Sequence, residues 1–432
     1  MLHRQAVARP LEGATSEAKT LVTELEQDRR PDEFEVAIER ILPGGLGLAH
    51  AEGKTIMVPL AAPGDRLRVR VDRTKGNVVF ARIEEIITPS PQRVEPPCPY
   101  FGRCGGCDFQ QLTYEAQLAA KIEIIRDCLR RLGGIENVPD FQITPAPNQW
   151  HYRTRAQWQY DSVRRWLGYF ESGSRRVCDV ADCAVLVPKL QGQLESLREQ
   201  VRAASIADDT RHFRAIAGDD SVSVVDDQGR DPTASARGRN LTVTEGVPKI
   251  TRTVRGESYE LYAGSFFQTN IDLLPQLIDA ALAKADGNSA VELYSGVGLF
   301  TVPLARTFAH VIAVEGDRVA ANFGTTNLAR AGLRNADVVN ANVADWLIKR
   351  APRDETLDFL LLDPPRTGAE SRVISGIIGL RPQRICYVSC DPATLARDLK
   401  KLIAGGYQLE RIAAFDMFPQ THHIETVVHL TC

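Results

Sequence analysis

The chain has 432 residues, enough for two or three domains, and its 44% hydrophobic and 25% charged content is typical of a globular protein. A net charge of −3 excludes a strongly basic nucleic-acid-binding surface over the whole chain, so any RNA contact must come from local patches. No apolar run approaches the length of a membrane span, and residues 1–20 lack the apolar core of a secretion signal. We therefore expect a cytoplasmic protein that does not contact a membrane.

Residues 1–32 lack a hydrophobic period and predict a mobile tail, with a short helix near Ser16–Gln27. From residue 33 to 92, turn signals separate short strand-like runs, which favours a small barrel of the OB type. The expected strands are Phe34–Ile41, Lys54–Val58, Arg66–Val71 and Val78–Ile87. Such barrels bind single-stranded nucleic acid. The candidate phosphate contacts are Arg66, Arg68, Arg70, Arg73 and Lys75, although a solvated barrel face without a partner is the alternative.

Three cysteines, Cys98, Cys104 and Cys107, lie close together at the start of the next segment. In a cytosolic chain this grouping indicates a metal rather than disulfides. A fourth ligand is needed, for which Cys183 is the best candidate and Cys178 the competitor. Four thiolates fit zinc or an iron–sulfur cluster. The spacing differs from the paired C-x2-C pattern of zinc sites and favours iron–sulfur without deciding it.

The remainder of this segment, up to residue 265, predicts a packed helix at Leu112–Leu132 and strands at Trp150–Tyr160 and Arg164–Phe170. Basic and aromatic residues alternate in the strands, which suits stacking on unpaired bases and contact with phosphates. Arg153 and Arg155 are therefore candidate RNA-binding residues, and an ordinary half-exposed sheet is the alternative. Residues 207–240 contain one candidate hairpin, about Gly218–Asp220.

From residue 266 the pattern becomes regularly α/β, with helical stretches between apolar strands. The expected strands are Ala290–Tyr294, His310–Glu315, Ala336–Asn340, Leu357–Leu362 and Arg384–Ser389. This alternation predicts a doubly wound, mostly parallel sheet. Two last runs, Gln408–Phe415 and Glu425–Leu430, have no helix between them and predict an antiparallel pair.

The turn after the first of these strands carries Gly296 and Gly298, which let a ligand approach the backbone at a helix N-terminus. Glu315 ends the next strand, where an acidic residue binds ribose hydroxyls. Thr301 replaces the third glycine of the dinucleotide fingerprint. The pattern therefore argues against a dehydrogenase and favours a site for S-adenosylmethionine (AdoMet), which has no pyrophosphate.

Two further strand ends carry candidate catalytic groups. Asp363-Pro-Pro-Arg366 is a stiff loop that would direct its acid and its arginine into the crevice beyond the sheet. Cys390 follows another strand, directly before a predicted helix whose N-terminus would favour a thiolate. A buried packing cysteine is the alternative, and that description fits Cys386 better.

Taken together, the motifs resemble those of the RNA uracil-C5 methyltransferases. The barrel resembles a TRAM domain, and the cysteine set resembles the [4Fe–4S] ligands of the branch that modifies 23S rRNA. The resemblance implies a class I AdoMet methyltransferase fold with an N-terminal OB-like barrel and a central α+β iron–sulfur domain. The implied segments are the tail 1–32, the barrel 33–92, the central domain 93–265 and the methyltransferase domain 266–432.

The resemblance also assigns residues. It implies that Cys390 is the nucleophile and Glu425 the general base. The implied AdoMet contacts are Gln268, Tyr294, Glu315, Asn342 and Asp363, with Gly296 and Gly298 in the turn, and the implied cluster ligands are Cys98, Cys104, Cys107 and Cys183. Leu299 departs from relatives that carry a polar residue there, so any ligand contact at that position must come from the backbone.

We therefore expect a monomeric enzyme that transfers a methyl group from AdoMet to C5 of a uridine in 23S rRNA, through a covalent bond between Cys390 and C6 of the base. Arg366 would stabilise the developing oxyanion, and Glu425 would remove the C5 proton, with His422 and His423 as rival bases. The alternatives are a tRNA uracil-54 methyltransferase and a non-catalytic RNA-binding protein. The presence of both Cys390 and Glu425 argues against the latter.

Overall fold

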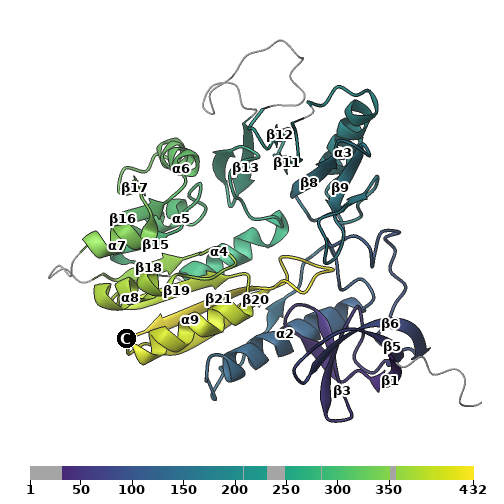
Figure 1. Cartoon of the computed structure of the whole chain (residues 1–432). Coiled ribbons are helices and arrows are strands. Elements are labelled where there is room, and N and C mark those ends of the chain that lie inside the picture. The colour runs from purple at the N-terminus through teal and green to yellow at the C-terminus, as the bar shows by residue number, and fades with distance from the viewer. Residues whose placement is uncertain (1–31, 208, 231–248, 284, 351–356) are drawn as a thin grey trace, which may run out of the picture. The chain divides into compact units, whose positions relative to one another are not determined.

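The computed structural model describes residues 32–207, 209–230, 249–283, 285–350 and 357–432 (Figure 1). The predicted tail up to residue 31 and its helix at Ser16–Gln27 lie outside these ranges. The chain divides into two compact units. One comprises Met1–Arg40 with Gly47–Pro91, and the other comprises Ile41–Leu46 with Gln92–Cys432.

The first strands of the chain form one six-stranded sheet in the order β1-β5-β6-β4-β3-β2. Their bounds are β1 Glu33–Ala37, β2 Arg40–Leu42, β3 Leu46–Ala51, β4 Lys54–Pro59, β5 Arg66–Lys75 and β6 Val78–Thr88. Between β1 and β2, the amide of Ile38 donates to Asp65 and that of Glu39 to Leu48, so this stretch bonds to opposite ends of the sheet. The sheet therefore curls into the predicted barrel around an aliphatic core.

The arginines of β5 already have partners on neighbouring strands. The ion pairs are Arg66 with Glu35, Arg68 with Glu85, and Arg70 with Glu33 and Glu84, while Arg73 lies 4.1 Å from the centre of the Phe80 ring. A phosphate would have to replace a carboxylate partner to bind the three paired arginines. The arginines expected to contact phosphate are therefore mostly paired with glutamates, and such paired arginines bind phosphate less strongly than unpaired ones would.

In the second unit, a five-stranded antiparallel sheet has the order β10-β9-β8-β11-β12. The bounds are β8 Arg155–Asp161, β9 Trp166–Phe170, β10 Val177–Asp179, β11 His212–Ala217 and β12 Val222–Asp226. β11 and β12 form the hairpin predicted about Gly218. Helix α3 (Pro188–Arg202) covers the sheet through four buried apolar positions, and Trp158 is fully buried beneath it. The strand predicted at Trp150–Tyr160 begins later than expected, because residues 150–154 are not part of β8.

An eight-stranded sheet carries the strands predicted in the last third of the chain, in the order β17-β16-β15-β18-β19-β21-β20-β7. The bounds are β7 Ile143–Thr144, β15 Gly287–Leu293, β16 Phe308–Glu315, β17 Ala336–Asn340, β18 Phe359–Leu362, β19 Arg384–Ser389, β20 Gln408–Phe415 and β21 Glu425–Thr431. The strands from β17 to β19 are parallel, and β21 runs antiparallel to both β19 and β20. The predicted fold class is confirmed.

Helices cover this sheet on both faces (Figure 1). Their bounds are α2 Tyr114–Arg131, α4 Leu274–Leu282, α5 Thr301–Thr307, α6 Arg318–Arg330, α7 Val343–Lys349, α8 Ser371–Leu380 and α9 Pro392–Ala404, with a 3-10 turn η1 at Ile271–Leu273 and a hairpin of β13 (Ile250–Val254) and β14 (Glu257–Leu261). Helices α7, α8, α9 and α2 pack in a row, while α4, α5 and α6 share the main hydrophobic core with the sheet. Among the described residues no helix is long and apolar enough to cross a bilayer.

The central segment contributes directly to the methyltransferase sheet. β7 pairs in parallel with the end of β20, and α2 packs against α9, although both precede residue 266. Segments far apart in the sequence therefore build one body, and the division at residue 265 stays a prediction.

Candidate active site

A cleft of about 920 Å³ opens at the carboxyl edge of the parallel strands. Most residues assigned from the sequence line it, namely Arg153, Arg155, Gln268, Tyr294, Gly296, Glu315, Asp363, Arg366, Cys390 and Glu425. The carboxyl ends of parallel strands meet at one edge of a sheet, and ligands of such folds bind there. The strand order therefore brings together Tyr294, Glu315, Asp363, Cys390 and Glu425, which are up to about 130 positions apart, while Arg155 comes from β8 of the five-stranded sheet.

Cys390 and Glu425 are neighbours because β21 reverses direction. Ser389, the last residue of β19, pairs with Thr426 of β21. The next position in this antiparallel register brings Cys390 beside Glu425. Glu425 is 1% exposed, and its Oε1 has no hydrogen-bond partner within the described residues. A buried acceptor without a partner is costly, so this carboxyl group is available to a ligand or a proton.

Burial changes the protonation of this pair. It raises the pKa of the Cys390 thiol to about 12, with further contributions from the nearby carboxyls of Glu425 and Asp363, against which Arg366 acts. Burial and the charge of Asp363 also raise the pKa of Glu425 well above its usual value. Burial therefore opposes the preference for a thiolate that the helix N-terminus is expected to give Cys390. The N-cap of α9 is Asp391, whose carboxylate accepts from Thr394 and offsets the helix dipole.

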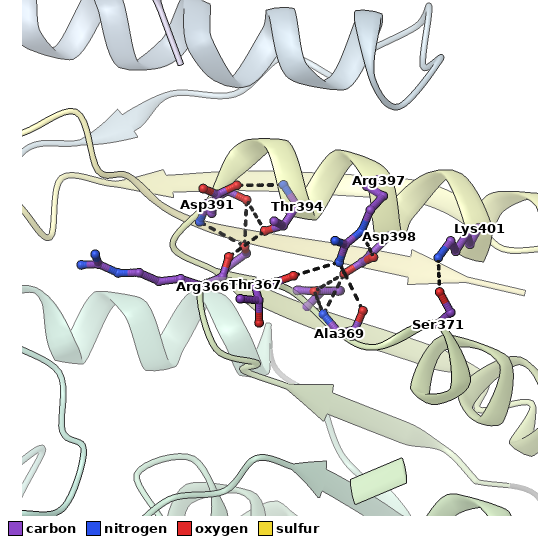
Figure 2. A network of polar contacts seen from close by, with 11 residues as sticks. Arg366, Thr367, Ala369, Ser371, Asp391, Thr394, Arg397, Asp398 and Lys401 are labelled. Carbon is purple, nitrogen blue, oxygen red and sulfur yellow. Dashed lines mark hydrogen bonds and ion pairs between the residues drawn. The ribbon is translucent and has the colours of Figure 1, made fainter. Parts of the chain in front are cut away.

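The loop that carries Asp363 and Arg366 is fixed to the side of α9 (Figure 2). The Arg397 guanidinium donates to the carbonyls of Thr367 and Ala369, at 3.1 and 3.2 Å. The buried carboxylate of Asp398 accepts from the amide of Ala369 at 2.9 Å. The side chain of Arg366 points away from this network and lines the cleft. One helix, α9, therefore positions Cys390 at its N-terminus and the loop of Arg366 along its side.

The first loop of the sheet, after β15, is tightly folded. Tyr294 has φ of 64°, a strained value for a residue with a side chain, and Gly296 also has positive φ. The amide of Gly296 donates to Glu315 Oε2 at 2.7 Å, and that of Asp317 donates to Oε1 at 2.6 Å. Glu315 therefore closes the loop and still presents its carboxylate to the cleft.

Two of the predicted cofactor residues do not line the cleft. Asn342 is the N-cap of α7, where its side chain accepts from the amide of Asp345 at 3.1 Å. Gly298, with φ of 93°, completes the turn by donating to Ser295 at 2.9 Å. Local structure explains the positions of both residues. Of the predicted AdoMet contacts, the one by Asn342 has the least support, because its side chain caps α7.

The cleft also contains residues that the sequence analysis does not assign. Phe418 and Thr421 lie in the loop before Glu425, Arg214 lies on β11, and Phe266 is two residues before Gln268. Phe266 is 58% exposed, with the Arg155 guanidinium 5.2 Å from its ring centre. Phe418, Thr421 and Phe266 are close in sequence to the motif residues Glu425 and Gln268, and this proximity could have indicated them. Nothing in the sequence indicates that β11 and its Arg214 lie in the cleft.

The cysteines predicted as ligands gather around a second, smaller cavity. Cys98, Cys104, Cys107 and Cys183 all line it, together with Arg153 and Tyr169. Cys178 does not line it; it is 1% exposed and accepts a hydrogen bond from Arg103 Nε at 3.2 Å. Of the two candidates for the fourth ligand, Cys183 is therefore the one that faces the other three.

Comparison with known proteins agrees with this geometry. Residues 234–432 match the family described as tRNA (Uracil-5-)-methyltransferase, and residues 34–92 match the TRAM domain of tRNA (uracil(54)-C(5))-methyltransferase. A 23S rRNA (uracil(1939)-C(5))-methyltransferase of Pectobacterium atrosepticum is 33% identical over 91% of this chain and 92% of its own. This chain belongs to the RNA uracil-C5 methyltransferase family. The family resemblance expected from the motifs is confirmed.

Other proteins are similar to this chain over the same extent. An uncharacterized RNA methyltransferase of Thermotoga maritima is 34% identical, covering 92% of this chain and 98% of its own. The solved structure of Pyrococcus abyssi tRNA (uracil-54, C5)-methyltransferase, in complex with S-adenosyl-L-homocysteine, has a TM-score of 0.71 and 26% identity. It covers 92% of this chain and 99% of its own. The enzyme is therefore an AdoMet-dependent RNA uracil-C5 methyltransferase.

Glu292 gives a testable pH effect at the base of this site. It is buried on β15, and burial raises its pKa to about 8, although the hydroxyl of Thr301 donates to Oε2 at 2.5 Å and opposes the shift. An unfolded glutamate titrates near ~4.3, so between these values the folded state keeps a proton that the unfolded state has released, and stability falls as pH rises. Glu292→Gln keeps the acceptor for Thr301 and does not titrate.

We expect the melting temperature of Glu292→Gln to rise relative to wild type by several degrees between about pH 5 and about pH 8. Differential scanning calorimetry at both pH values measures this difference. Glu123→Gln, at a largely exposed position on α2, is the control and should follow wild type. Parallel wild-type and Glu292→Gln curves would show that Glu292 is already ionised in the folded enzyme.

Proposed function

We propose that this enzyme methylates C5 of a uridine in 23S rRNA through a covalent adduct on Cys390. The observation that carries the proposal is the shared cleft, in which Cys390, Glu425 and Arg366 lie beside the loop residues expected to hold AdoMet. The choice of rRNA rests on similarity. The rRNA-modifying relatives are 33% identical to this chain, compared with 26% for the tRNA-modifying enzyme of known structure.

The residues near β15 and β18 fit AdoMet. Burial raises the pKa of Asp363 to about 7, and a side-chain hydrogen bond from Gln268 opposes the shift. A cationic ligand beside Asp363 would offset the cost of burying its carboxylate. AdoMet supplies such a cation and an electrophilic methyl group. Tyr294 and Glu315 would border the rest of the molecule, with Glu315 directed at ribose hydroxyls.

The walls of the cleft fit RNA. Arg153, Arg155 and Arg214 lie close enough that burial and the two neighbouring cations lower the pKa of Arg155 to about 10. Arg214 Nε is buried and lacks a hydrogen-bond partner within the described residues. These clustered cations form no ion pair with a carboxylate among the described residues, which suits a phosphate, and the exposed Phe266 ring suits an unstacked base.

The proposed chemistry starts from the Cys390 thiolate, whose proton has passed to water. Sγ forms a bond to C6 of the uracil, and the C5=C6 electron pair moves through C4 onto O4, where Arg366 stabilises the negative charge. C5 then bonds to the methyl carbon, while the methyl–sulfur bond breaks and leaves its electron pair on the sulfur of S-adenosylhomocysteine. The Glu425 carboxylate removes the C5 proton, C5=C6 forms again, and the Sγ–C6 bond breaks to return the thiolate.

Electrostatics favours Glu425 over the histidines as the base. Burial lowers the pKa of His423 to about 3, with His422 and Arg366 acting in the same direction, so His423 binds a proton weakly. His422 is bonded to Asp108 and does not line the cleft. Glu425, whose pKa is raised, binds a proton more strongly than His423, and a cationic ligand would favour the ionised form that can act as the base.

The cysteine cavity fits a [4Fe–4S] cluster better than zinc. In a cluster each thiolate binds a different iron, whereas zinc needs all four sulfurs about 2.3 Å from one point. The described residues contain no group of three or more His, Cys, Asp or Glu that could hold a metal ion as it stands, so the cavity and the spacing of the cysteines carry the proposal. The four cysteines instead surround a cavity, so we propose that they hold the cluster.

The substrate is tested with unmodified 23S rRNA and tRNA transcripts, labelled AdoMet and mapping of 5-methyluridine by mass spectrometry. We expect one or two labelled uridines in 23S rRNA and background label in tRNA. Label confined to tRNA would identify the tRNA uracil-54 alternative. If neither RNA is labelled by protein that binds AdoMet, the rRNA proposal is wrong and the chain binds RNA without modifying these substrates.

Replacing the base should trap the adduct. In Glu425→Gln, Cys390 can still attack C6 and the methyl group can still transfer, but the C5 proton stays and the thiolate cannot leave. A methyl-labelled protein–RNA adduct should therefore accumulate and survive a denaturing gel. Cys390→Ala, alone or combined with Glu425→Gln, should form none. Near wild-type turnover without adduct in Glu425→Gln would place the base elsewhere, and His423→Ala would be measured next.

Iron content tests the cysteine site. Protein purified without oxygen should be brown, absorb broadly near ~400 nm and contain about four irons per chain. Cys183→Ser should lose most of this iron, because its sulfur faces the cavity, whereas Cys178→Ser should retain it. One zinc per chain without iron contradicts the cluster, and the reverse response of the two variants would make Cys178 the fourth ligand.

A further inference from the structure

The loop between β20 and β21, residues 416–424, forms one wall of the cleft. Phe418, Thr421 and His423 line the cleft, and Glu425 follows directly as the first residue of β21. In Figure 1 this yellow loop reaches the blue part of the chain beside α2, and several hydrogen bonds join the two. The wall therefore depends on residues about 300 positions earlier in the sequence.

Four carbonyls or amides of the loop are bonded to side chains of that earlier segment. Lys121 Nζ donates to the carbonyl of Phe418 at 3.1 Å, and Tyr152 donates to that of Pro419 at 2.9 Å. The other two bonds are made by loop amides: that of His422 donates to Asp108, and that of Gln420 donates to Gln117.

Gln117 forms a reciprocal pair with Gln420. The Gln420 amide donates to Gln117 Oε1 at 2.9 Å, and Gln117 Nε2 donates to Gln420 Oε1 at 3.0 Å. Gln420 is 2% exposed and has φ of 68°, a conformation that costs energy for a residue with a side chain. Such a conformation persists where the surroundings hold it, and Gln117 supplies two of the bonds that do so.

Asp108 makes the closest attachment to the catalytic end of the loop. Its Oδ1 accepts from the amide of His422 at 2.8 Å, and its Oδ2 is paired with the His422 imidazole. The amides of Asp108 and Phe109 both donate to the carbonyl of Gln420, at 3.1 and 3.0 Å. The His422 ring lies 4.2 Å from that of His423, which lines the cleft.

The same short segment also carries the cysteine cavity. Asp108 directly follows Cys107, and Arg153, Tyr169 and Gly106 line both the cavity and the cleft. The cavity and the cleft therefore share a wall, and the segment 104–109 spans the distance between them.

We propose that Asp108 and Gln117 are positioning residues, which hold the loop 416–424 so that its side chains line the cleft beside Cys390 and tie the loop to the cysteine-bearing segment. This proposal rests on the proposed function of Cys390 and Glu425. Neither residue lines the cleft, so neither is expected to touch the reacting atoms. Their effect should appear in turnover and in the mobility of the loop, and AdoMet affinity should be preserved.

The test compares Asp108→Ala, Asp108→Asn and Gln117→Ala with wild type in the full chain. Asp108→Ala and Gln117→Ala should each lower kcat by about 10- to 100-fold, since small misplacements cost that much, with KM for AdoMet within about twofold. Amide hydrogen exchange should become about tenfold faster across residues 416–424, and not only at the one amide whose acceptor the substitution removes. Asp108→Asn keeps an acceptor for the His422 amide and should recover most of both losses.

Glu123→Ala is the matched control, because this residue lies on α2 with 64% of its side chain exposed and is paired only with nearby Arg126. It should leave both readouts unchanged. Unchanged kcat and unchanged loop exchange in Asp108→Ala and Gln117→Ala would overturn the proposal, as would a uniform increase in exchange over the whole sheet. If wild type methylates no RNA, the proposed function fails, but the exchange comparison still decides whether these residues hold the loop.

Discussion

The reversal of one strand determines where Cys390 and Glu425 lie. The parallel strands β15, β16, β18 and β19 all end at the same edge of the sheet, which collects their terminal side chains there. A further parallel strand would have placed its first residue at the opposite edge. Because β21 is antiparallel to β19, its first residue, Glu425, lies instead beside Cys390. The loop 416–424 exists to make this reversal, and its attachments to the central segment follow from its place over the cleft.

Charge is the second constraint on the cleft. The Arg366 guanidinium acts on the Cys390 thiol and the Glu425 carboxyl, the charge of Asp363 acts on both as well, and burial raises the pKa of all three acids. In the free enzyme, burial therefore favours the protonated forms of Asp363, Cys390 and Glu425. A cationic ligand near Asp363 changes this balance in favour of the ionised forms. The reactive state of the site therefore belongs to the complex with its ligands, and the helix N-terminus at Cys390 contributes less than the sequence alone indicates.

Local signals account for what could be predicted from the sequence. The strands of the large sheet are apolar runs followed by glycine, proline or capping residues, so their ends, and with them Tyr294, Glu315, Asp363 and Cys390, could be placed in advance. β3, which consists of Leu, Gly, Ala and His and contains no β-branched residue, carries no such signal and was not predicted. Long-range partners were not predictable either. The carboxylates opposite the barrel arginines, the bond from Asp108 to His422, and Arg214 in the cleft wall all depend on pairing between distant segments.

The two-residue strand β7 has a consequence for how this enzyme can be divided. It covers the outer edge of β20, and α2 from the same segment covers α9. A fragment beginning at residue 266 would expose unpaired backbone groups along β20 together with the apolar surface beneath α2. Exposed edges of this kind recruit strands from other molecules and lead to aggregation. The eight-stranded sheet is thus completed by a segment far earlier in the chain. During synthesis the edge strand β7 is made before β20, the strand that it covers.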